Sequence, residues 1–328
     1  MTSPTTSPRL GWIGLGSMGL AMCTNLQTHL KAHNLPPLHY TNRTLSRGDT
    51  LKPLGAIACA TVEEVVQNSD IIFISLSDDA TVTATITTIL TTTTTTTPHK
   101  ILVDTTTLHP TTTSTLTTQV TSANHTYIAA PVFGSTPSAR SGTLLIAVAG
   151  PASAITAISP FLTGILARKV LEAGPSPQQA QVLKTASNYI TASLHYTVSE
   201  AHVLGEKTGL PAGLLDTLIE QNFGAYAHAV SRRMVEGAYC PALGEAPSSG
   251  LELGIKDVGH GVGVAREHGV GLEVGELCLR AMGEAREWGE REGRGRRLDS
   301  TAVYGSVRVR AGLGFESGVV RERDGGAE

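Results

Sequence analysis

The chain has 328 residues, a length that exceeds one ordinary compact core and favours two domains. Hydrophobic residues make up 41% of it and charged residues 16%, which is typical of a soluble globular protein and not of a disordered or fibrous one. The formal net charge of −3, without a long basic stripe, excludes the charge pattern of a nucleic-acid-binding protein. No apolar stretch approaches the roughly 20 residues of a membrane span, so no membrane partner is expected either.

Targeting signals, metal sites and disulfides are not expected. The first eight residues are rich in Ser, Thr and Pro and lack an apolar core, which argues against a secretory or mitochondrial signal. The four cysteines, Cys23, Cys59, Cys240 and Cys278, are far apart and form no Cys-x-x-Cys pair. We expect buried, reduced thiols, a cytoplasmic location and no metal site. The basic run 291–297 is interpreted as a solvated helix end and loop.

Short apolar runs alternate with helix-compatible stretches in the first half of the chain. The predicted strands are 10–15, 38–41, 56–60, 71–76, 101–104, 127–130, 144–149 and 169–172, and the predicted helices include 17–33, 62–67, 79–90 and 152–162. Several of these strands are apolar with little alternation, as in a parallel sheet that helices cover on both faces. The threonine run 91–97 closes a threonine-rich helix candidate, and the end of that element is expected to be a solvated connection before Pro98, because β-branched residues lose side-chain freedom in helices.

After Pro177 only helical spacing is found, with predicted helices at 178–210, 212–236, 251–268 and 272–290. The predicted fold class is therefore α/β: an N-terminal doubly wound Rossmann domain over residues 1–174 and an all-α domain over residues 175–328. The last dozen residues are expected to be a frayed tail.

A glycine-rich segment follows the first predicted strand and opens the first predicted helix. It reads Leu10-Gly-Trp-Ile-Gly14-Leu-Gly16-Ser-Met-Gly19, and a G-x-G-x-x-G pattern in this context indicates a dinucleotide site. Gly14 permits the tight turn, Gly16 lets the backbone approach a pyrophosphate, and Gly19 allows close helix–strand packing. The amides at the helix N-terminus bind the anion. The cofactor-binding residues assigned here are Gly14, Leu15, Gly16, Ser17, Met18 and Gly19.

The end of the second predicted strand selects between the two nicotinamide cofactors. An NAD site usually places a carboxylate there for the ribose 2′-hydroxyl, whereas this chain has Asn42-Arg43-Thr44. Arg43 suits a 2′-phosphate at close to the usual spacing, ~20 residues beyond the glycines, and Thr44 adds a hydroxyl donor. We predict NADP(H). The alternative is that Arg43 is only a surface residue and that both cofactors are accepted.

With these residues in view, the chain resembles the β-hydroxyacid dehydrogenases, a family that includes 3-hydroxyisobutyrate dehydrogenase and, more distantly, 6-phosphogluconate dehydrogenase. The resemblance extends over nearly the whole chain through four blocks in the same order. The first block, the glycine segment with Asn42-Arg43-Thr44, is similar to the NADP-using members. The second, Asp104-Thr-Thr-Thr107-Leu-His-Pro110, resembles the family's Asp-x-Ser-Thr-x-x-Pro loop and implies that Thr107 contacts the cofactor. Leu76 matches another cofactor-lining position, and His109 is interpreted as structural.

The third block, Ala130-Pro-Val-Phe133-Gly134-Ser135, resembles the family's Ala-Pro-Val-Ser-Gly-Gly loop, which binds the substrate carboxylate. Phe133 stands where serine is usual, and Ser135 where the second glycine is usual. Phenylalanine removes a hydroxyl donor and adds apolar bulk, which makes the pocket less suited to a small carboxylate. The resemblance assigns Phe133, Gly134 and Ser135 to substrate binding.

The fourth block, Lys184-Thr-Ala-Ser-Asn188, looks like the family's Lys-x-x-x-Asn pair. Positions i and i+4 share one helix face, so both side chains are expected to point together into a cleft between the domains. The resemblance implies that Lys184 is the general acid and base of hydride transfer and that Asn188 orients the substrate or a water. Lys256, in Lys256-Asp257, is similar to a family lysine that reaches the cofactor.

Two alternatives stay open. Imine reductases share this architecture and the NADPH preference, but they commonly have Asp or Tyr in place of Lys184. Lys184 therefore favours hydroxyacid chemistry. Phe133, which makes the pocket more apolar, is compatible with an imine reductase. A non-catalytic dinucleotide-binding protein is the second alternative, since fold alone does not decide function. The resemblance also implies a homodimer or homotetramer formed through the helical domain.

Overall fold

The computed structural model describes the chain except for residues 1–6, 95–96 and 326–328. Parts of three predictions lie outside the described residues: the absence of an N-terminal signal, the solvated threonine run and the frayed C-terminal end. The described chain forms two compact units, residues 1–184 and 185–328. This division falls inside a long helix, α7 (Gln178–Thr208), whereas the sequence prediction placed the domain boundary just before that helix.

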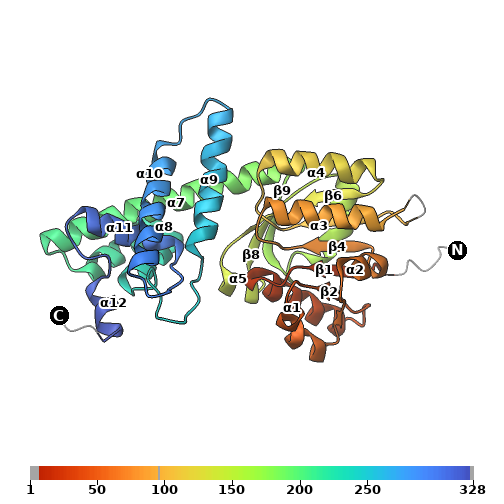
Figure 1. Cartoon of the computed structure of the whole chain (residues 1–328), viewed down its shortest axis with the longest axis horizontal. Helices are drawn as coiled ribbons and strands as arrows, with labels where there is room; N and C mark the ends of the chain where they lie inside the picture. The colour runs from red at the N-terminus through yellow and green to blue at the C-terminus, as the bar shows by residue number, and fades with distance from the viewer. Residues whose placement is uncertain (1–6, 95–96, 326–328) are drawn as a thin grey trace. The chain divides into compact units, whose positions relative to one another are not determined.

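The described part of the first unit contains one sheet of nine strands (Figure 1). They are β1 (Leu10–Ile13), β2 (His39–Thr41), β3 (Ile57–Ala58), β4 (Ile71–Ile74), β5 (Ile101–Asp104), β6 (Thr126–Ala129), β7 (Val132–Phe133), β8 (Leu144–Ala149) and β9 (Ala167–Gly174). Their order is β3-β2-β1-β4-β5-β6-β8-β7, with β9 beside β8. The strands from β3 to β6 in this order are parallel, which is the Rossmann arrangement and confirms the predicted α/β class.

Helices cover both faces of this sheet. They are α1 (Ser17–Ala32), α2 (Val62–Asn68), α3 (Asp79–Thr92), α4 (Pro110–Ser122), α5 (Thr136–Arg140) and α6 (Ala152–Ile158), with 3₁₀ segments at Leu45–Leu54 and Ser159–Phe161. Alternate residues of β4 serve the two faces: Ile71 and Phe73 belong to the apolar cluster of α1 and α6, and Ile72 and Ile74 to that of α2, α3 and α4. Burial on both sides explains why this strand is apolar throughout.

The threonine-rich helices show where the propensity argument was too strict. Helix α3 continues to Thr92, beyond the predicted end at residue 90, so the first residues of the threonine run belong to the helix that the run closes. Helix α4 was not among the predicted helices, and its sequence is rich in β-branched residues. Its hydroxyls bond back to the helix, as Thr117 Oγ1 does to the carbonyl of Thr113 at 2.7 Å. Burial of Leu116 and Val120 against the sheet stabilises α4 despite its low propensity.

The regular elements described for the second unit are helical (Figure 1). Beyond α7 they are α8 (Ala212–Val235), α9 (Leu251–Glu267), α10 (Glu273–Arg291), a 3₁₀ segment at Ser300–Ala302, α11 (Val303–Arg310) and α12 (Gly318–Arg323). The four long helices confirm the predicted all-α region, with bounds close to those expected. Helix α8 kinks at Gly224, whose φ of 80° is a backbone conformation that favours glycine.

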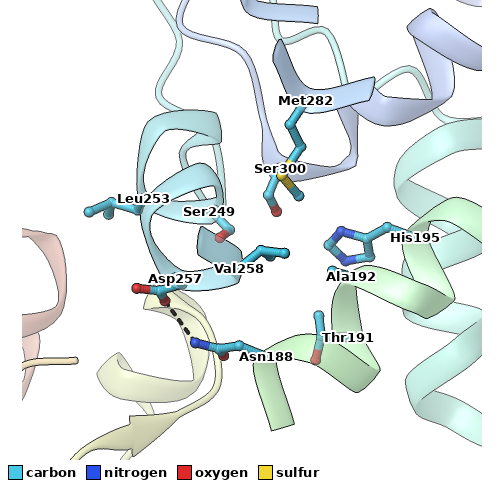
Figure 2. A pocket seen from close by; sticks show the side chains of 11 residues that line it. Asn188, Thr191, Ala192, His195, Ser249, Leu253, Asp257, Val258, Met282 and Ser300 are labelled. Atoms are coloured by element: carbon cyan, nitrogen blue, oxygen red, sulfur yellow. Dashed lines mark hydrogen bonds between the residues drawn. The ribbon is translucent and has the colours of Figure 1, made fainter. Parts of the chain in front are cut away.

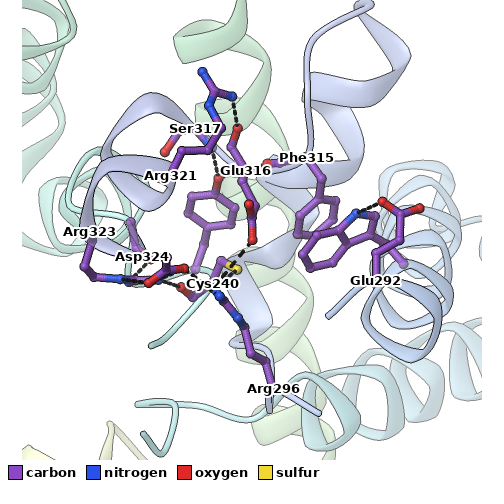
Figure 3. A network of polar contacts seen from close by, with 12 residues as sticks. Cys240, Glu292, Arg296, Phe315, Glu316, Ser317, Arg321, Arg323 and Asp324 are labelled. Carbon is purple, nitrogen blue, oxygen red and sulfur yellow. Dashed lines mark hydrogen bonds and ion pairs between the residues drawn. The ribbon is translucent and has the colours of Figure 1, made fainter. Parts of the chain in front are cut away.

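The expectation of a frayed C-terminal tail is wrong for the described residues. Residues 318–323 form α12, whose Val320 is fully buried in the core of the helical unit. Arg323 Nη2 donates to the carbonyl of Cys240 at 2.8 Å, which anchors the helix end (Figure 3). The sequence signal was a pair of valines inside a charged run, and only the tertiary contacts of the second valine order this segment.

The basic run was also only partly solvated. Arg291 is exposed as expected, but the side chain of Arg296 is 2% exposed. Arg296 Nη2 lies 2.6 Å from Asp324 Oδ2, and Nη1 lies 3.6 Å from Glu316 Oε1 (Figure 3). A buried guanidinium requires such partners, and here they come from the C-terminal segment. The run therefore fastens the chain end to the helical core.

The cysteine prediction is confirmed: Cys23, Cys59, Cys240 and Cys278 are all buried and free. Among the residues described, we find no helix with both the length and the apolar character needed to cross a membrane.

Candidate cofactor and substrate site

The three glycines after β1 have different steric surroundings. Gly14 has a φ of 100°, and a Cβ there would lie 2.2 Å from the carbonyl oxygen of Ser75. A Cβ on Gly19 would lie 2.3 Å from the carbonyl oxygen of Gly14. Both positions therefore require glycine for the turn and for the close packing of α1. A Cβ on Gly16, in contrast, would meet no atom within 4 Å. The backbone at Gly16 therefore borders open space, which a ligand needs in order to approach it closely.

The candidate cofactor residues lie at the carboxyl ends of adjacent strands. The order of strands reverses between β1 and β4, and ligands of open α/β sheets bind at such a switch point. Gly14 follows β1, Leu76 follows β4 and Thr107 follows β5. The amide of Leu76 donates to Thr106 Oγ1 at 3.1 Å, which joins the second and third of these turns. The open space at Gly16 and the first turn of α1 fit a dinucleotide pyrophosphate at this edge.

The turn after β2 is braced by Asn42. Its Oδ1 accepts from the amide of Leu15 at 2.9 Å, and its Nδ2 donates to the carbonyl of Thr44 at 2.9 Å. Arg43 and Thr44 are exposed beside this brace, and so is Arg47, which sequence reasoning did not single out. The structure thus gives Asn42 a role in shaping the turn, while its contact with a cofactor stays a prediction.

A buried carboxyl group at the end of β5 fixes the loop that follows this strand. Asp104 is fully buried; its Oδ2 accepts from Tyr127 Oη at 2.7 Å and its Oδ1 from the amide of Thr106 at 2.8 Å. Burial raises the pKa of Asp104 to about 6, although the hydrogen bonds from Tyr127 and Thr106 act in the opposite direction. These bonds fix the backbone that presents Thr107.

Gln181 joins helix α7 to the same loop. The side chain is fully buried; Nε2 donates to the carbonyl of Thr106 at 2.9 Å and Oε1 accepts from the amide of Leu108 at 3.1 Å. Gln181 lies three residues before Lys184, so this clamp fixes the turn of α7 that carries the lysine. Sequence reasoning missed Gln181. Its only signal was a polar residue one turn before Lys184, without any indication of its distant partners.

His109 has a structural position. It caps the N-terminus of α4, where Nδ1 accepts from the amide of Thr111 at 3.3 Å, and its own amide donates to Asp79 Oδ1 at 2.9 Å. This geometry agrees with the structural interpretation of His109 and gives no reason to treat it as an acid.

Phe133 faces Lys184. The residue lies in β7, which pairs with β8 and was not predicted as a strand. Lys184 Nζ is 5.0 Å from the centroid of the Phe133 ring, a cation–π contact. Gly134, which follows, has a φ of 131° that a side chain would strain, and Ser135 precedes α5. The two departures from the family loop therefore flank a glycine turn, and the aromatic one contacts the candidate acid.

Asn188 belongs to a polar cluster of the helical unit. Its Nδ2 donates to Asp257 Oδ2 at 3.0 Å, and Asp257 Oδ1 lies 3.1 Å from Lys256 Nζ. Lys184 and Asn188 are one turn apart on the continuous helix α7 and so share one face of it. The lysine–aspartate pair of α9 is therefore connected to Asn188, while the predicted contact of Lys256 with a cofactor stays a prediction.

A Rossmann sheet with a glycine turn at its switch point, followed by a helical unit, defines the class of two-part dinucleotide-binding oxidoreductases. Comparison with protein families agrees with this class. Residues 9–174 match the NAD-binding domain of 6-phosphogluconate dehydrogenase, and residues 179–305 match the NAD-binding model of NADP-dependent 3-hydroxyisobutyrate dehydrogenase. The chain belongs to the β-hydroxyacid dehydrogenase family, whose members bind a nicotinamide dinucleotide.

Individual relatives cover most of the chain. The NADH-dependent oxidoreductase ucdB of Aspergillus ustus is 29% identical over 303 residues, with 92% of this chain and 99% of the relative covered. The 3-hydroxyisobutyrate dehydrogenase of Mycobacterium tuberculosis, solved with L-serine, has a TM-score of 0.73 at 21% identity and covers 92% of this chain and 99% of its own. An imine reductase of Streptomyces aurantiacus has a TM-score of 0.59 at 20% identity, with 92% and 99% covered. The two structures establish the fold alone.

Proposed function

We propose that the protein is an NADP(H)-dependent oxidoreductase that transfers a hydride between the nicotinamide and a small substrate of the hydroxyacid or semialdehyde type. The observation that carries the proposal is the placement of Lys184. Its amine lies over Phe133 of the candidate substrate loop, and Gln181 clamps the same turn of α7 to the candidate cofactor loop. An amine held at this point meets the requirement for a proton donor beside a reacting carbonyl.

In the reducing direction, NADPH would supply the hydride when it is bound. The carbonyl oxygen of the substrate then needs a proton, which Lys184 gives from its ammonium group. In the oxidising direction the neutral amine of Lys184 takes the proton from the substrate hydroxyl. Asn188 donates through its amide nitrogen to Asp257, which fixes the side chain (Figure 2). Its carboxamide oxygen then accepts a hydrogen bond from a hydroxyl group or a water next to Lys184. Phe133 holds the ammonium by its ring face and excludes water from that side.

The function is tested by NADPH oxidation with small aldehydes, 2-oxoacids and cyclic imines. We expect turnover of a semialdehyde or an oxoacid. Turnover of imines alone would show that the protein is an imine reductase. This second candidate function is supported by the apolar Phe133 and by the shared fold. Tight NADPH binding without turnover of any of these classes would favour a non-catalytic dinucleotide-binding protein.

The cofactor preference has its own test at the exposed Arg43. A guanidinium beside the ribose binds a 2′-phosphate but gains nothing from a 2′-hydroxyl. We expect wild-type kcat/KM to be higher with NADPH than with NADH. Arg43→Ala should lower the NADPH value by about 10- to 100-fold, the effect of one charge-assisted contact, and change the NADH value little.

Arg140, an exposed arginine of the same unit at the end of α5, provides the control, and Arg140→Ala should leave the preference unchanged. A clear NADH preference of the wild type, as the name of the Aspergillus relative states for that protein, would contradict the proposal. Steady-state kinetics with both cofactors at varied concentration measures these effects.

We further propose a cytoplasmic homodimer or homotetramer assembled through the helical unit. Four buried, free cysteines support a reducing compartment. Several large apolar side chains of α7 and α8 are exposed by more than half, which supports a covered surface in the assembly: Ile190, Leu204, Leu214, Leu218 and Phe223. The mass of the protein in solution distinguishes an oligomer from a monomer.

A further inference from the structure

Two neighbouring turns of the first unit carry the candidate anion contacts of the cofactor. The glycine turn after β1 is the proposed pyrophosphate site, and the turn after β2 carries Arg43, the proposed ligand of the 2′-phosphate. Leu15 of the first turn and Asn42 of the second are 27 residues apart in the sequence. Because β1 and β2 are adjacent parallel strands, both turns leave the sheet at the same edge. One side chain can therefore contact both turns.

The peptide group between Gly14 and Leu15 is held at both of its polar ends. Its carbonyl oxygen accepts from Trp12 Nε1 at 2.8 Å, and its N–H donates to Asn42 Oδ1 at 2.9 Å. Trp12 is fully buried and stacks on Phe73 with ring centroids 5.4 Å apart, which fixes the indole. This peptide group is thus engaged within the protein. The first turn of α1, whose N–H groups have no partner inside the helix, begins two residues further on.

The side chain of Asn42 also reaches the second turn. Its Nδ2 donates to the carbonyl of Thr44 at 2.9 Å, and the same carbonyl accepts from the amide of Arg47 at 3.1 Å. The bond from the side chain of residue 42 to the backbone of residue 44 closes a ring that contains the backbone of Arg43. The Cα of Arg43 is therefore fixed, although the residue is exposed.

A carboxamide meets both requirements at position 42. The amide of Leu15 needs an acceptor and the carbonyl of Thr44 needs a donor, and a planar carboxamide offers both from one rigid group. An aspartate, the residue type that usually bonds the ribose of NAD, would place its second oxygen against the carbonyl of Thr44. A leucine of similar shape would supply neither bond. The side chain of Asn42 thus links the two turns in a way that neither replacement can.

We propose that Asn42 is a positioning residue that couples the pyrophosphate turn to Arg43 and thereby selects NADP(H) over NAD(H). The proposal rests on the proposed cofactor preference, because it requires the guanidinium of Arg43 to bind the 2′-phosphate. It gives Asn42 an indirect role, through the backbone of both turns, where the sequence suggested a direct contact. The link fixes the spacing of the two anion sites, so one dinucleotide can occupy both without the entropic cost of ordering them.

The test measures the binding of both cofactors and needs no substrate. Titration of nicotinamide fluorescence gives the Kd of NADPH and of NADH for the wild type, for Asn42→Leu, for Arg43→Ala and for the double variant. Asn42→Leu should lower the preference for NADPH, expressed as the ratio of the two Kd values, by about 3- to 10-fold. In the Arg43→Ala background the same replacement should change the ratio by less than about 2-fold, because a positioning residue has no effect once the group that it positions is gone.

Trp12→Phe tests the other end of the braced peptide group. Phenylalanine retains an aromatic ring for the stacking on Phe73 and removes the N–H that holds the carbonyl of Gly14. We expect the Kd of NADPH and of NADH to rise by the same factor, about 3- to 10-fold, since both cofactors share the pyrophosphate. The ratio should keep its wild-type value. A loss of stability alone would likewise leave the ratio unchanged, so the fall expected for Asn42→Leu is specific to the link with Arg43.

Asn68→Leu is the matched control for the substitution. Asn68 is an exposed asparagine of the same unit, and its Nδ2 donates to the carbonyl of Glu64 in its own helix at 2.8 Å. Both Kd values should equal those of the wild type. Asn42→Ala serves as the second variant if leucine at position 42 prevents folding, because alanine removes the same two hydrogen bonds without adding bulk.

The outcomes separate this proposal from the cofactor preference on which it rests. A clear wild-type preference for NADPH that Asn42→Leu leaves unchanged would overturn the coupling alone. A fall in the ratio that is equal with and without Arg43 would also overturn it, because Asn42 would then act on the 2′-phosphate directly. If the wild type bound NADH as tightly as NADPH, the proposed preference would fail first and the coupling with it.

Discussion

Replacement of Lys184 by alanine is expected to lower kcat by about 10²- to 10⁴-fold, the usual contribution of a positioned general acid. The Kd for NADPH should change little, since the candidate cofactor residues other than Lys256 lie on the glycine turn and at the strand ends. The physical reason is that hydride transfer to a carbonyl leaves an oxyanion, and alanine gives it no proton. Single-turnover kinetics with a substrate found in the NADPH oxidation assay, beside a fluorescence titration of NADPH, measures both quantities.

Two further variants make the assignment specific. Lys184→Arg keeps a cation over the ring of Phe133 but cannot release a proton near neutral pH, so it should stay nearly as inactive as Lys184→Ala. Lys207→Ala removes an exposed lysine from the end of the same helix and should retain wild-type kcat. If Lys184→Ala instead lost NADPH affinity in proportion to kcat, Lys184 would be a cofactor ligand and its assignment as acid and base would be wrong.

Gln181 shows why only part of this site was predictable. The sequence indicated Lys184 and Asn188 because their spacing is local and matches a helix turn. The clamp from Gln181 to the loop at Thr106 and Leu108 joins segments more than 70 residues apart, and no local pattern encodes such a pairing.

The elements of the fold also differ in whether local sequence or tertiary contacts determine them. The central strands were predictable because burial on two faces makes them apolar throughout. Helices α7 to α10 were predictable from their long amphipathic patterns. Both signals are properties of consecutive residues. Helix α4 and the C-terminal helix α12 depend on what they pack against: α4 overrides the low helix propensity of threonine, and α12 is fastened by Val320 and by Arg323. Propensity reasoning fails where tertiary burial supplies the stabilisation.

The glycine turn gives the clearest separation of folding from cofactor binding. Gly16 has φ −62° and ψ −179°, values that any residue adopts, and a Cβ there meets open space. We expect Gly16→Val to change the free energy of unfolding by no more than about 0.5 kcal/mol. The same side chain would occupy the space that we propose for the pyrophosphate, so the Kd for NADPH should rise by about 100-fold or more, roughly 3 kcal/mol.

Gly19→Ala is expected to behave differently, because it places a methyl group 2.3 Å from the carbonyl oxygen of Gly14. The backbone has to shift, and overpacking of this kind costs about 1–3 kcal/mol of stability. Urea denaturation of the unliganded proteins and NADPH titration of the folded ones measure the two effects separately. Wild-type NADPH affinity in Gly16→Val would show that the pyrophosphate does not lie on this turn, and the cofactor site would have to be sought elsewhere in the chain. If Gly16→Val instead lost as much stability as Gly19→Ala, all three glycines would serve the fold. The open space at Gly16 is what distinguishes a binding position from a packing position, so such a loss would contradict the assignment of Gly16 to cofactor binding.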